Sequence, residues 1–271
     1  MVLSLLEKYN IKGGIFDQHF LVDEGYLDRI VAAAELRSED IVLEIGAGVG
    51  NLTERLAHKA KKVIAIELDP ILVNVLHDHF DYIKNIEIVA GDALKVDFPK
   101  FDKVVSNLPY SISSEITFKL LHHRFKFGIL MYQYEFAARM ISAPNCKDYS
   151  RLTVDTYYFS DASILMKVPK EAFQPVPQVN SAVVKIVPRP TPFRVRDEAF
   201  FMKFVAAVFN QRRKKIRNAI LNTNCTLKIP RIKELIAQLP ENLMDKRAEN
   251  LTPEQLAEVA NLIVDLRSKS L

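Results

Sequence analysis

The segment Asn107-Leu108-Pro109-Tyr110 follows a β-branched run, and its residues are suited to holding a planar nitrogen base. The exocyclic amine of adenine is a weak nucleophile because its lone pair is delocalised into the ring. The Asn107 amide oxygen and the Leu108 carbonyl would accept its two N–H bonds and favour a more nucleophilic nitrogen. Pro109 would fix the backbone beside that carbonyl, and Tyr110 would provide a ring for stacking. An Asn-x-Pro turn at a strand end accounts for the same residues without a ligand.

Phe173 offers a second aromatic ring for such a base. It precedes Pro175 and Pro177, and a stiff proline-rich loop can project an aromatic side chain at little cost in conformational entropy. A base flipped out of its helix would then lie between Tyr110 and Phe173. The alternative is that Phe173 is an ordinary core residue beneath the loop.

A glycine-rich turn and two acidic residues predict a nucleoside site. Gly46, Gly48 and Gly50 lie between a strand-like and a helix-like segment, without the G-x-G-x-x-G spacing of dinucleotide sites. Glu67 ends the next strand-like segment, where a carboxylate can accept hydrogen bonds from ribose hydroxyls, and Asp92 after the third would accept from an adenine amine. Both acids would otherwise cap ordinary turns. An acid after each of these strands is typical of S-adenosyl-L-methionine methyltransferases rather than NAD enzymes.

The segment 16–23, with sequence FDQHFLVD, precedes the glycine turn and has no clear periodicity. We expect it to fold over the cofactor. Gln18 and His19 would alternatively be ordinary surface residues, since a lone histidine usually has no special role.

A dense basic run lies in the C-terminal third of the chain, on a helix predicted over 197–221. Like charges at close helical spacing repel each other, so a phosphate backbone is a suitable counter-charge. A solvated helix face is the alternative. The run consists of Arg212, Arg213, Lys214, Lys215 and Arg217.

Strand-like apolar segments alternate with amphipathic, helix-like segments from residue 41 onward. This alternation predicts a parallel sheet with helices on both faces, because parallel strands need crossover connections. The predicted strands cover 41–45, 62–68, 86–92, 102–107 and 127–133, and two later ones, 160–169 and 181–188, would pair as a hairpin-like addition.

The predicted fold class is therefore α/β: a Rossmann-like, doubly wound methyltransferase sheet, mostly parallel with an antiparallel late strand, and a small C-terminal helical domain. The sequence PRPTP at 188–192 is a stiff break. We expect a methyltransferase domain over 1–188 and a helical, RNA-binding domain over 189–271, with a further helix over 251–266.

Composition is that of an ordinary globular protein. The 271 residues are 49% hydrophobic and carry a formal charge of +4, which permits a nucleic-acid partner without requiring one. Cys146 and Cys225 have no metal or redox spacing, and we recognise neither a signal peptide nor a membrane span. We expect a cytoplasmic, metal-free monomer.

Several motifs together resemble the ribosomal RNA adenine N6-dimethyltransferases, and archaeal members in particular. The macrolide-resistance rRNA methyltransferases are similar too, but less so over the tail. The resemblance spans nearly the whole chain and rests on FDQHFL, LEIGAGVGNLT, VIAIELD, GDAL, NLPYSISSEI, AFQPVPQVNSAVV, NQRRKKIRNA and RAENLTPEQL.

The resemblance implies a cofactor site for S-adenosyl-L-methionine and a base site beside it. Leu108 and Tyr110 would hold the adenine opposite Phe173, and Asn107 would face its amine. His19 stands where bacterial members commonly have asparagine. The implied cofactor contacts are His19, Leu21, Gly46, Glu67, Asp92 and Asn107, and the predicted site also takes in Gln18, Gly48, Leu68 and Ala93.

The implied activity is methyl transfer to N6 of two adjacent adenines near the 3′ end of small-subunit rRNA, giving N6,N6-dimethyladenine. We expect in-line transfer without a metal or a dedicated general base. The family also implies a role in ribosome biogenesis, on an immature small subunit. The alternatives are a DNA adenine or small-molecule methyltransferase, and a catalytically silent ribosome-assembly or nucleic-acid-binding factor that retains the fold.

Overall fold

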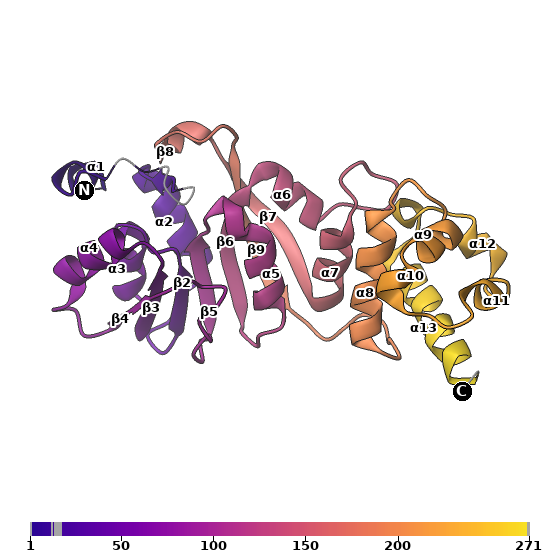
Figure 1. Ribbon diagram of the computed structural model, residues 1–271. Coiled ribbons are helices and arrows are strands. Elements are labelled where there is room, and N and C mark those ends of the chain that lie inside the picture. Colours follow the sequence, from indigo (N-terminus) through magenta and orange to yellow (C-terminus); the bar gives the residue numbers. More distant parts are fainter. Residues whose placement is uncertain (1, 12, 14–17, 270–271) are drawn as a thin grey trace. The chain divides into compact units, whose positions relative to one another are not determined.

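The computed structural model describes residues 2–11, 13 and 18–269 of the chain (Figure 1). Its internal contacts divide the chain into two compact units. The first unit runs to Ala137 and resumes over Asp161–Pro188. The second consists of Ala138–Ser160 and the chain from Arg189 onward.

The segment 138–160 belongs to the second unit, whereas we expected it in the first domain. The reason is its apolar side chains. Tyr149, Val154 and Tyr158 are buried in one cluster with residues of the C-terminal helices. The chain therefore passes from the first unit to the second twice, and the second passage, after Pro188, coincides with the expected boundary.

The first unit is built on one sheet, whose strand order within the described residues is β4-β3-β2-β5-β6-β9-β7. The strands from β4 to β6 are parallel to their neighbours, and β9 is antiparallel to β6. This topology confirms the predicted fold class, including the antiparallel late strand. The strands are β2 (Ile41–Ile45), β3 (Lys62–Glu67), β4 (Ile86–Ala90), β5 (Lys103–Asn107), β6 (Phe127–Gln133), β7 (Ser160–Val168) and β9 (Ser181–Pro188).

Helices connect the parallel strands, and their start signals are readable in the sequence. The Asp69 side chain accepts a hydrogen bond from the backbone N–H of Ile71, and Pro70 occupies the first turn of α4. A short two-stranded sheet pairs β1 (Phe20–Leu21) with β8 (Phe173–Gln174). The helices are α1 (Val2–Lys8), α2 (Glu24–Ala33), α3 (Asn51–Ala57), α4 (Pro70–Phe80), α5 (Ser113–Leu121) and α6 (Tyr134–Met140), with short 3₁₀ turns η2 (Tyr110–Ile112) and η3 (Lys170–Ala172).

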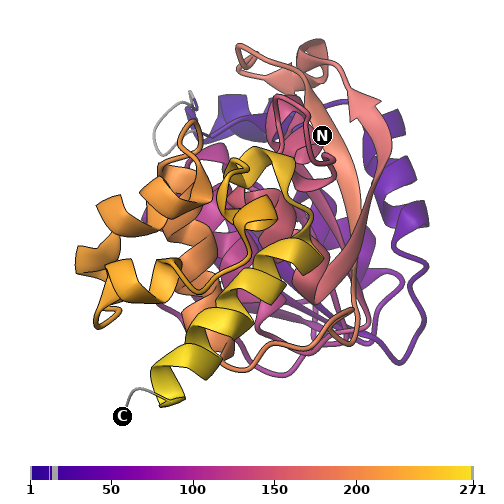
Figure 2. The ribbon, with the colours of Figure 1, turned by 90° about the vertical axis from the view of Figure 1, so that its right-hand side faces the viewer.

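The second unit is helical around an aromatic-rich core, in which Phe201 and Phe204 of α8 are fully buried. Figure 2 shows its helices from α8 onward in orange and yellow, ending with the long α13. The predicted helix over 251–266 is present as α13, and Thr252 Oγ1 accepts from the backbone N–H of Gln255 in its first turn at 3.3 Å. The helices are α7 (Arg151–Phe159), α8 (Glu198–Asn210), α9 (Ile216–Asn222), α10 (Asn224–Leu227), α11 (Ile232–Ile236), α12 (Glu241–Met244) and α13 (Pro253–Lys269), with a 3₁₀ turn η4 (Ala248–Asn250).

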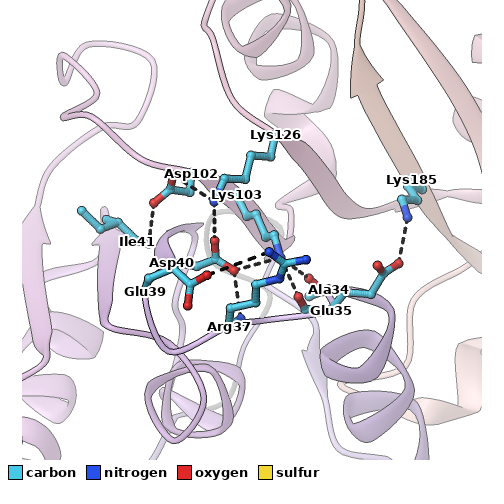
Figure 3. Close-up of polar contacts among 10 residues, drawn as sticks. All are labelled: Ala34, Glu35, Arg37, Glu39, Asp40, Ile41, Asp102, Lys103, Lys126 and Lys185. Carbon is cyan, nitrogen blue, oxygen red and sulfur yellow. Dashed lines mark hydrogen bonds and ion pairs between the residues drawn. The ribbon is translucent and has the colours of Figure 1, made fainter.

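A buried ion-pair network fastens the amino ends of β2, β5 and β6 (Figure 3). Asp40 is fully buried, 2.9 Å from the Lys103 ammonium and 2.8 Å from that of Lys126. Lys103 also donates to backbone carbonyls just past α2, and Asp102 accepts from the backbone N–H of Ile41. Burial opposes the ionisation of Asp40, but hydrogen bonds from Lys126 and Lys103 outweigh it and lower its pKa to about 2.

Candidate active site

A cavity in the first unit lies at the carboxyl ends of β2, β3 and β5, the edge where open parallel sheets bind ligands. It contains about 650 Å³ not filled by protein atoms, counting the part open to solvent. The predicted site residues that line it are Gln18, His19, Leu21, Gly46, Gly48, Glu67, Asn107, Leu108, Pro109 and Tyr110.

The glycine turn after β2 brings the backbone close to the predicted base-binding segment. Gly46 and Gly48 have φ of 75° and 61°, in the left-handed region that glycine adopts without strain. A Cβ atom on Gly46 would lie 3.0 Å from Cδ of Pro109, and one on Gly48 would lie 3.3 Å from the ring of Phe20. A side chain at either position would crowd Pro109 or Phe20, so glycine allows this close approach.

Glu67, at the end of β3, is buried against this turn. Its Oε2 accepts from the backbone N–H of Gly48 at 2.8 Å, and its Oε1 accepts from those of Leu68 and Asp69. Burial raises the pKa of Glu67, although these hydrogen bonds favour the ionised form. The acid thus lies where a ribose was predicted, and it ties the glycine turn to β3.

Glu44, the last residue but one of β2, also lines the cavity, and we did not predict it. Only 2% of it is exposed, its Oε2 has no hydrogen-bond partner among the described residues, and burial raises its pKa to about 8. The nearby negative charge of Glu67 acts in the same direction. The signal was an acid two residues before Gly46 in an otherwise apolar strand.

Asn107, the last residue of β5, is oriented by a hydrogen bond. Its Nδ2 donates to the backbone carbonyl of His19 at 3.1 Å. Because the amide nitrogen is used in this way, the amide oxygen points away from that carbonyl. This orientation suits the predicted role of the oxygen as an acceptor.

Tyr110 opens the turn η2 directly after Pro109, and its ring stacks on His19. The ring centroids are 5.7 Å apart and the rings are inclined by 28°. The Tyr110 hydroxyl lies 2.6 Å from Oγ of Ser181, and Nδ1 of His19 lies 2.8 Å from the carbonyl oxygen of Pro175. His19 is therefore the ring beside Tyr110 in this structure.

Residues 18–21, part of the segment 16–23 that we expect to fold over the cofactor, line the cavity. Gln18 donates from Nε2 to Asp69 Oδ2 at 2.9 Å, which ties this segment to the start of α4. Residues 16 and 17 of the same motif lie outside the described residues.

Phe173 is not the second ring of a sandwich in this structure. It is 1% exposed, does not line the cavity, and packs in an apolar cluster that includes Leu21 and Leu27. The pairing of β8 with β1 sets Phe173 opposite Leu21, and this pairing carries its side chain into the core. Phe173 thus takes the core position that the sequence left open as an alternative, and its role as the second ring stays a prediction.

Asp92, Ala93 and Leu68 lie beside the cavity residues without lining the cavity. Asp92 follows β4, the strand next to β3, and its Oδ1 accepts from the backbone N–H of Leu94 at 2.9 Å. Leu68 is 48% exposed, whereas Ala93 is buried. Asp92 is thus at the expected sheet edge, adjacent to the strand that ends in Glu67.

The basic run 212–217 lies in the second unit, and most of it is not helical, contrary to our prediction. Helix α8 ends at Asn210 and α9 begins at Ile216. The break has a physical cause, because Lys215 forms a β-bridge with Arg247 and the N–H of Ile216 donates to a backbone carbonyl. The run therefore forms a turn paired to a second basic segment.

Acidic neighbours pair with part of this run. Arg212 lies 2.8 Å from Glu249, Lys215 lies 3.4 Å from Asp245, and Arg217 also contacts Asp245. No ion pair among the described residues involves Arg213, Lys214 or Lys246.

A surface cavity in the second unit is bordered by both basic segments. We did not predict Lys246 and Arg247; the signal was the KR pair in DKRAEN. The lining residues are Asn145, Arg213, Lys214, Lys215, Asn218, Asp245, Lys246, Arg247 and Asn250.

Within residues 2–11, 13 and 18–269, no helix combines the length and apolar character needed to cross a membrane. The same residues contain no group of three or more histidine, cysteine or acidic side chains placed to hold a metal ion.

Sequence comparisons match almost the full chain. The family described as "Ribosomal RNA adenine dimethylase" matches residues 12–265. A Methanosarcina barkeri protein named "Probable ribosomal RNA small subunit methyltransferase A" is 78% identical over 271 residues, covering 100% of this chain and 94% of the relative. A Methanosphaera stadtmanae protein of the same name is 43% identical over 266 residues, covering 96% and 97%. Both relatives are archaeal, as the motifs predicted.

Solved structures agree with the sequence comparisons. A dimethyladenosine transferase from Plasmodium falciparum has a TM-score of 0.77 at 34% identity, over 93% of this chain and 98% of that one. The 23S rRNA methyltransferase ErmE has a TM-score of 0.65 at 28% identity, over 90% and 99%. The chain therefore belongs to the family of ribosomal RNA adenine dimethylases.

Proposed function

We propose that this protein transfers methyl groups from S-adenosyl-L-methionine to N6 of two adjacent adenines near the 3′ end of small-subunit rRNA, twice per base. The observation that carries the proposal is one cavity that holds both the glycine turn with Glu67 and the segment Asn107–Tyr110. A donor site and an acceptor site must share a cavity for direct transfer.

The residues present fit the cofactor. Gly46 and Gly48 let the backbone of the turn pass close to Pro109 and Phe20 at the cavity, and Glu44 has a buried oxygen without a hydrogen-bond partner among the described residues. We assign the ribose to Glu67 and the adenine amine to Asp92. When bound, S-adenosyl-L-methionine supplies a methyl group activated by its positively charged sulfur.

The acceptor residues position the target amine. Asn107 is held by its bond to the His19 carbonyl, so its oxygen is available to accept from the amine with the Leu108 carbonyl. Tyr110 is the stacking platform. Because His19 lies on Tyr110 in this structure, an entering base would either displace His19 or lie against it.

The basic cavity of the second unit is the proposed contact with the RNA backbone. Arg213, Lys214 and Lys246 are exposed and border one cavity, which suits a run of phosphates. Relatives named as small-subunit rRNA methyltransferases support this substrate. We propose an immature small subunit as the physiological substrate, with a role in ribosome biogenesis, acting as a monomer in the cytoplasm.

The test is the transfer of labelled methyl groups to small subunits, DNA and free nucleosides. We expect incorporation into small-subunit rRNA alone. Asn107→Ala should reduce it by at least about 100-fold, the scale of losing one aligned polar group at a reacting atom, with an unchanged unfolding temperature. Near-normal turnover by Asn107→Ala would exclude the proposed amine site, and binding without incorporation by the wild type would indicate the catalytically silent alternative.

A further inference from the structure

Lys119 of α5 holds the loop that carries Asp92. Its ammonium lies 2.8 Å from the carbonyl oxygen of Ala93, 3.3 Å from that of Leu94 and 2.5 Å from that of Val96. An ammonium has three N–H donors, so these carbonyls use its whole donor set. We call residues 91–98 the Asp92 loop.

The charge of Lys119 is directed to this loop rather than to an acid. No ion pair among the described residues involves Lys119, and its ammonium lies 4.1 Å from the centroid of the Phe98 ring at the end of the loop. Hydrogen bonds from a charged donor are stronger than neutral ones. Lys119 is therefore the main polar anchor of the loop from outside.

The Asp92 loop is also held from inside by Asp92. The backbone N–H groups of Lys95 and Val96 donate to the Asp92 carbonyl, and that of Leu94 donates to its side chain. These bonds form a tight turn, and the backbone N–H of Gly91 joins its start to β3 by donating to the carbonyl of Glu67 at 2.8 Å. The bonds to Lys119 hold the rest of the turn, at Ala93, Leu94 and Val96.

Helix α5 is itself firmly placed in the first unit. Ile116 and Leu120 on either side of Lys119 in sequence are 0% and 2% exposed. The helix begins directly after the turn η2 that contains Tyr110. One helix thus follows the proposed base site and holds the loop of the proposed cofactor acid.

We propose that Lys119 is a positioning residue for recognition of the cofactor's adenine. It sets the Asp92 loop so that the Asp92 carboxylate can accept from the 6-amino group of the purine. The inference rests on the role assigned to Asp92 in the proposed function. Replacing Lys119 with an apolar residue leaves three carbonyls without their donor and releases the loop.

The test compares two ligands that differ in one group. S-adenosylhomocysteine and its analogue lacking the 6-amino group are titrated by calorimetry into the full-length wild type, Lys119→Met, Lys119→Arg and Lys119→Gln. The wild type should prefer the amino ligand by at least about tenfold, the scale of one hydrogen bond to a charged group. Lys119→Met should lower the affinity for the amino ligand about tenfold and change the affinity for the analogue less than about twofold.

Control variants separate positioning from a general loss of structure. Lys100→Met removes the same charge from an exposed residue just past the loop and should leave both affinities unchanged. Lys119→Arg should restore most of the preference, and Lys119→Gln should retain part of it if Lys119→Met does not fold. In an Asp92→Ala background, Lys119→Met should have no further effect on the amino ligand.

If the Lys119 variants lowered the affinity for both ligands equally, or left the preference for the amino ligand unchanged, the inference would be overturned while the cofactor site stayed intact. A wild type that binds neither ligand would instead overturn the proposed function and the inference together.

Discussion

The buried acids at the two ends of the central sheet differ in whether they form ion pairs. At the amino end, Asp40 is fully buried and contacts the ammonium groups of Lys103 and Lys126. At the carboxyl end, Glu44 and Glu67 are 2% and 6% exposed, and no ion pair among the described residues involves either of them. Similar burial thus accompanies paired charge at one end and unpaired acids at the other.

The pKa values follow the partners rather than the burial. Lysine hydrogen bonds overcome burial and lower the pKa of Asp40 to about 2, whereas burial raises that of Glu44 to about 8. Fully paired charge fastens the sheet, and buried acids without a cation suit a positively charged ligand. The difference marks the carboxyl end as the functional one on physical grounds alone.

Breaking the paired end should have the largest effect on stability. Lys103→Met leaves Asp40 buried with only Lys126 beside it, so we expect a loss of about 3 to 5 kcal/mol in the free energy of unfolding, measured by urea denaturation. Glu39→Gln, at an exposed pair with Arg37, is the matched control and should change stability by less than about 0.5 kcal/mol. Equal effects of the two variants would remove the distinction between the ends.

The contribution of Glu44 to the free energy of unfolding should change with pH in the opposite direction to that of Asp40. The pKa of Glu44 is raised in the folded state, so its contribution to stability is full below about pH 4.5 and declines as pH rises toward 8. Glu44→Gln should remove this slope of about 1.4 kcal/mol per pH unit. Denaturation at pH 5, 6.5 and 8 measures it, and parallel curves for variant and wild type would contradict the assignment.

The contribution of Asp40 to stability instead increases with pH. Its pKa is lowered in the folded state, so its contribution is present above about pH 3.8 and is lost as pH falls through about 2. Lys103→Met should weaken that dependence, so the difference in stability between the variant and the wild type should be full near neutrality and should shrink as the pH falls through about 2.

Glu67→Gln should affect ligand binding more than stability. The amide keeps the size of the side chain but removes one acceptor and the charge, so we expect cofactor affinity to fall about tenfold, the scale of one charged hydrogen bond. Calorimetric titration with S-adenosylhomocysteine measures it. A variant that binds as tightly as the wild type would show that this acid is only a cap for the backbone N–H groups of Gly48 and Asp69.

Tyr110→Phe should have the smallest effect. It removes the hydroxyl that lies 2.6 Å from Ser181 but keeps the ring, so we expect a loss of about 1 kcal/mol in stability and kcat/KM within about threefold. Tyr110→Ala, which removes the platform, should lower kcat/KM by at least about tenfold. Similar kinetics for the two variants would argue against stacking.

The strands and the main cavity residues could be predicted from the sequence. Alternating apolar segments located each parallel strand to within two residues at its ends, because a strand buried on both faces has a distinct composition. Glu67 and Asn107 were found because residues at the ends of parallel strands share one edge. The positions of the strands and of the residues at their ends can thus be inferred from short stretches of sequence.

The remaining features depend on contacts between distant segments. Phe173 entered the core because β8 pairs with β1, and the basic run left the helix because Lys215 pairs with Arg247. Glu44 was missed because an acid within a strand has no meaning until its surroundings are known. Neither pairing nor burial of this kind can be inferred from local residue types.

The central claim is that Asn107 and its neighbours direct methyl transfer to adenine N6 in small-subunit rRNA. The most direct test is mass-spectrometric mapping of N6,N6-dimethyladenine in immature small subunits incubated with S-adenosyl-L-methionine and either the wild type or Asn107→Ala. We predict two adjacent dimethylated adenines near the 3′ end with the wild type and none with the variant. Dimethylation by the variant at the wild-type level, or none by the wild type, would contradict the account.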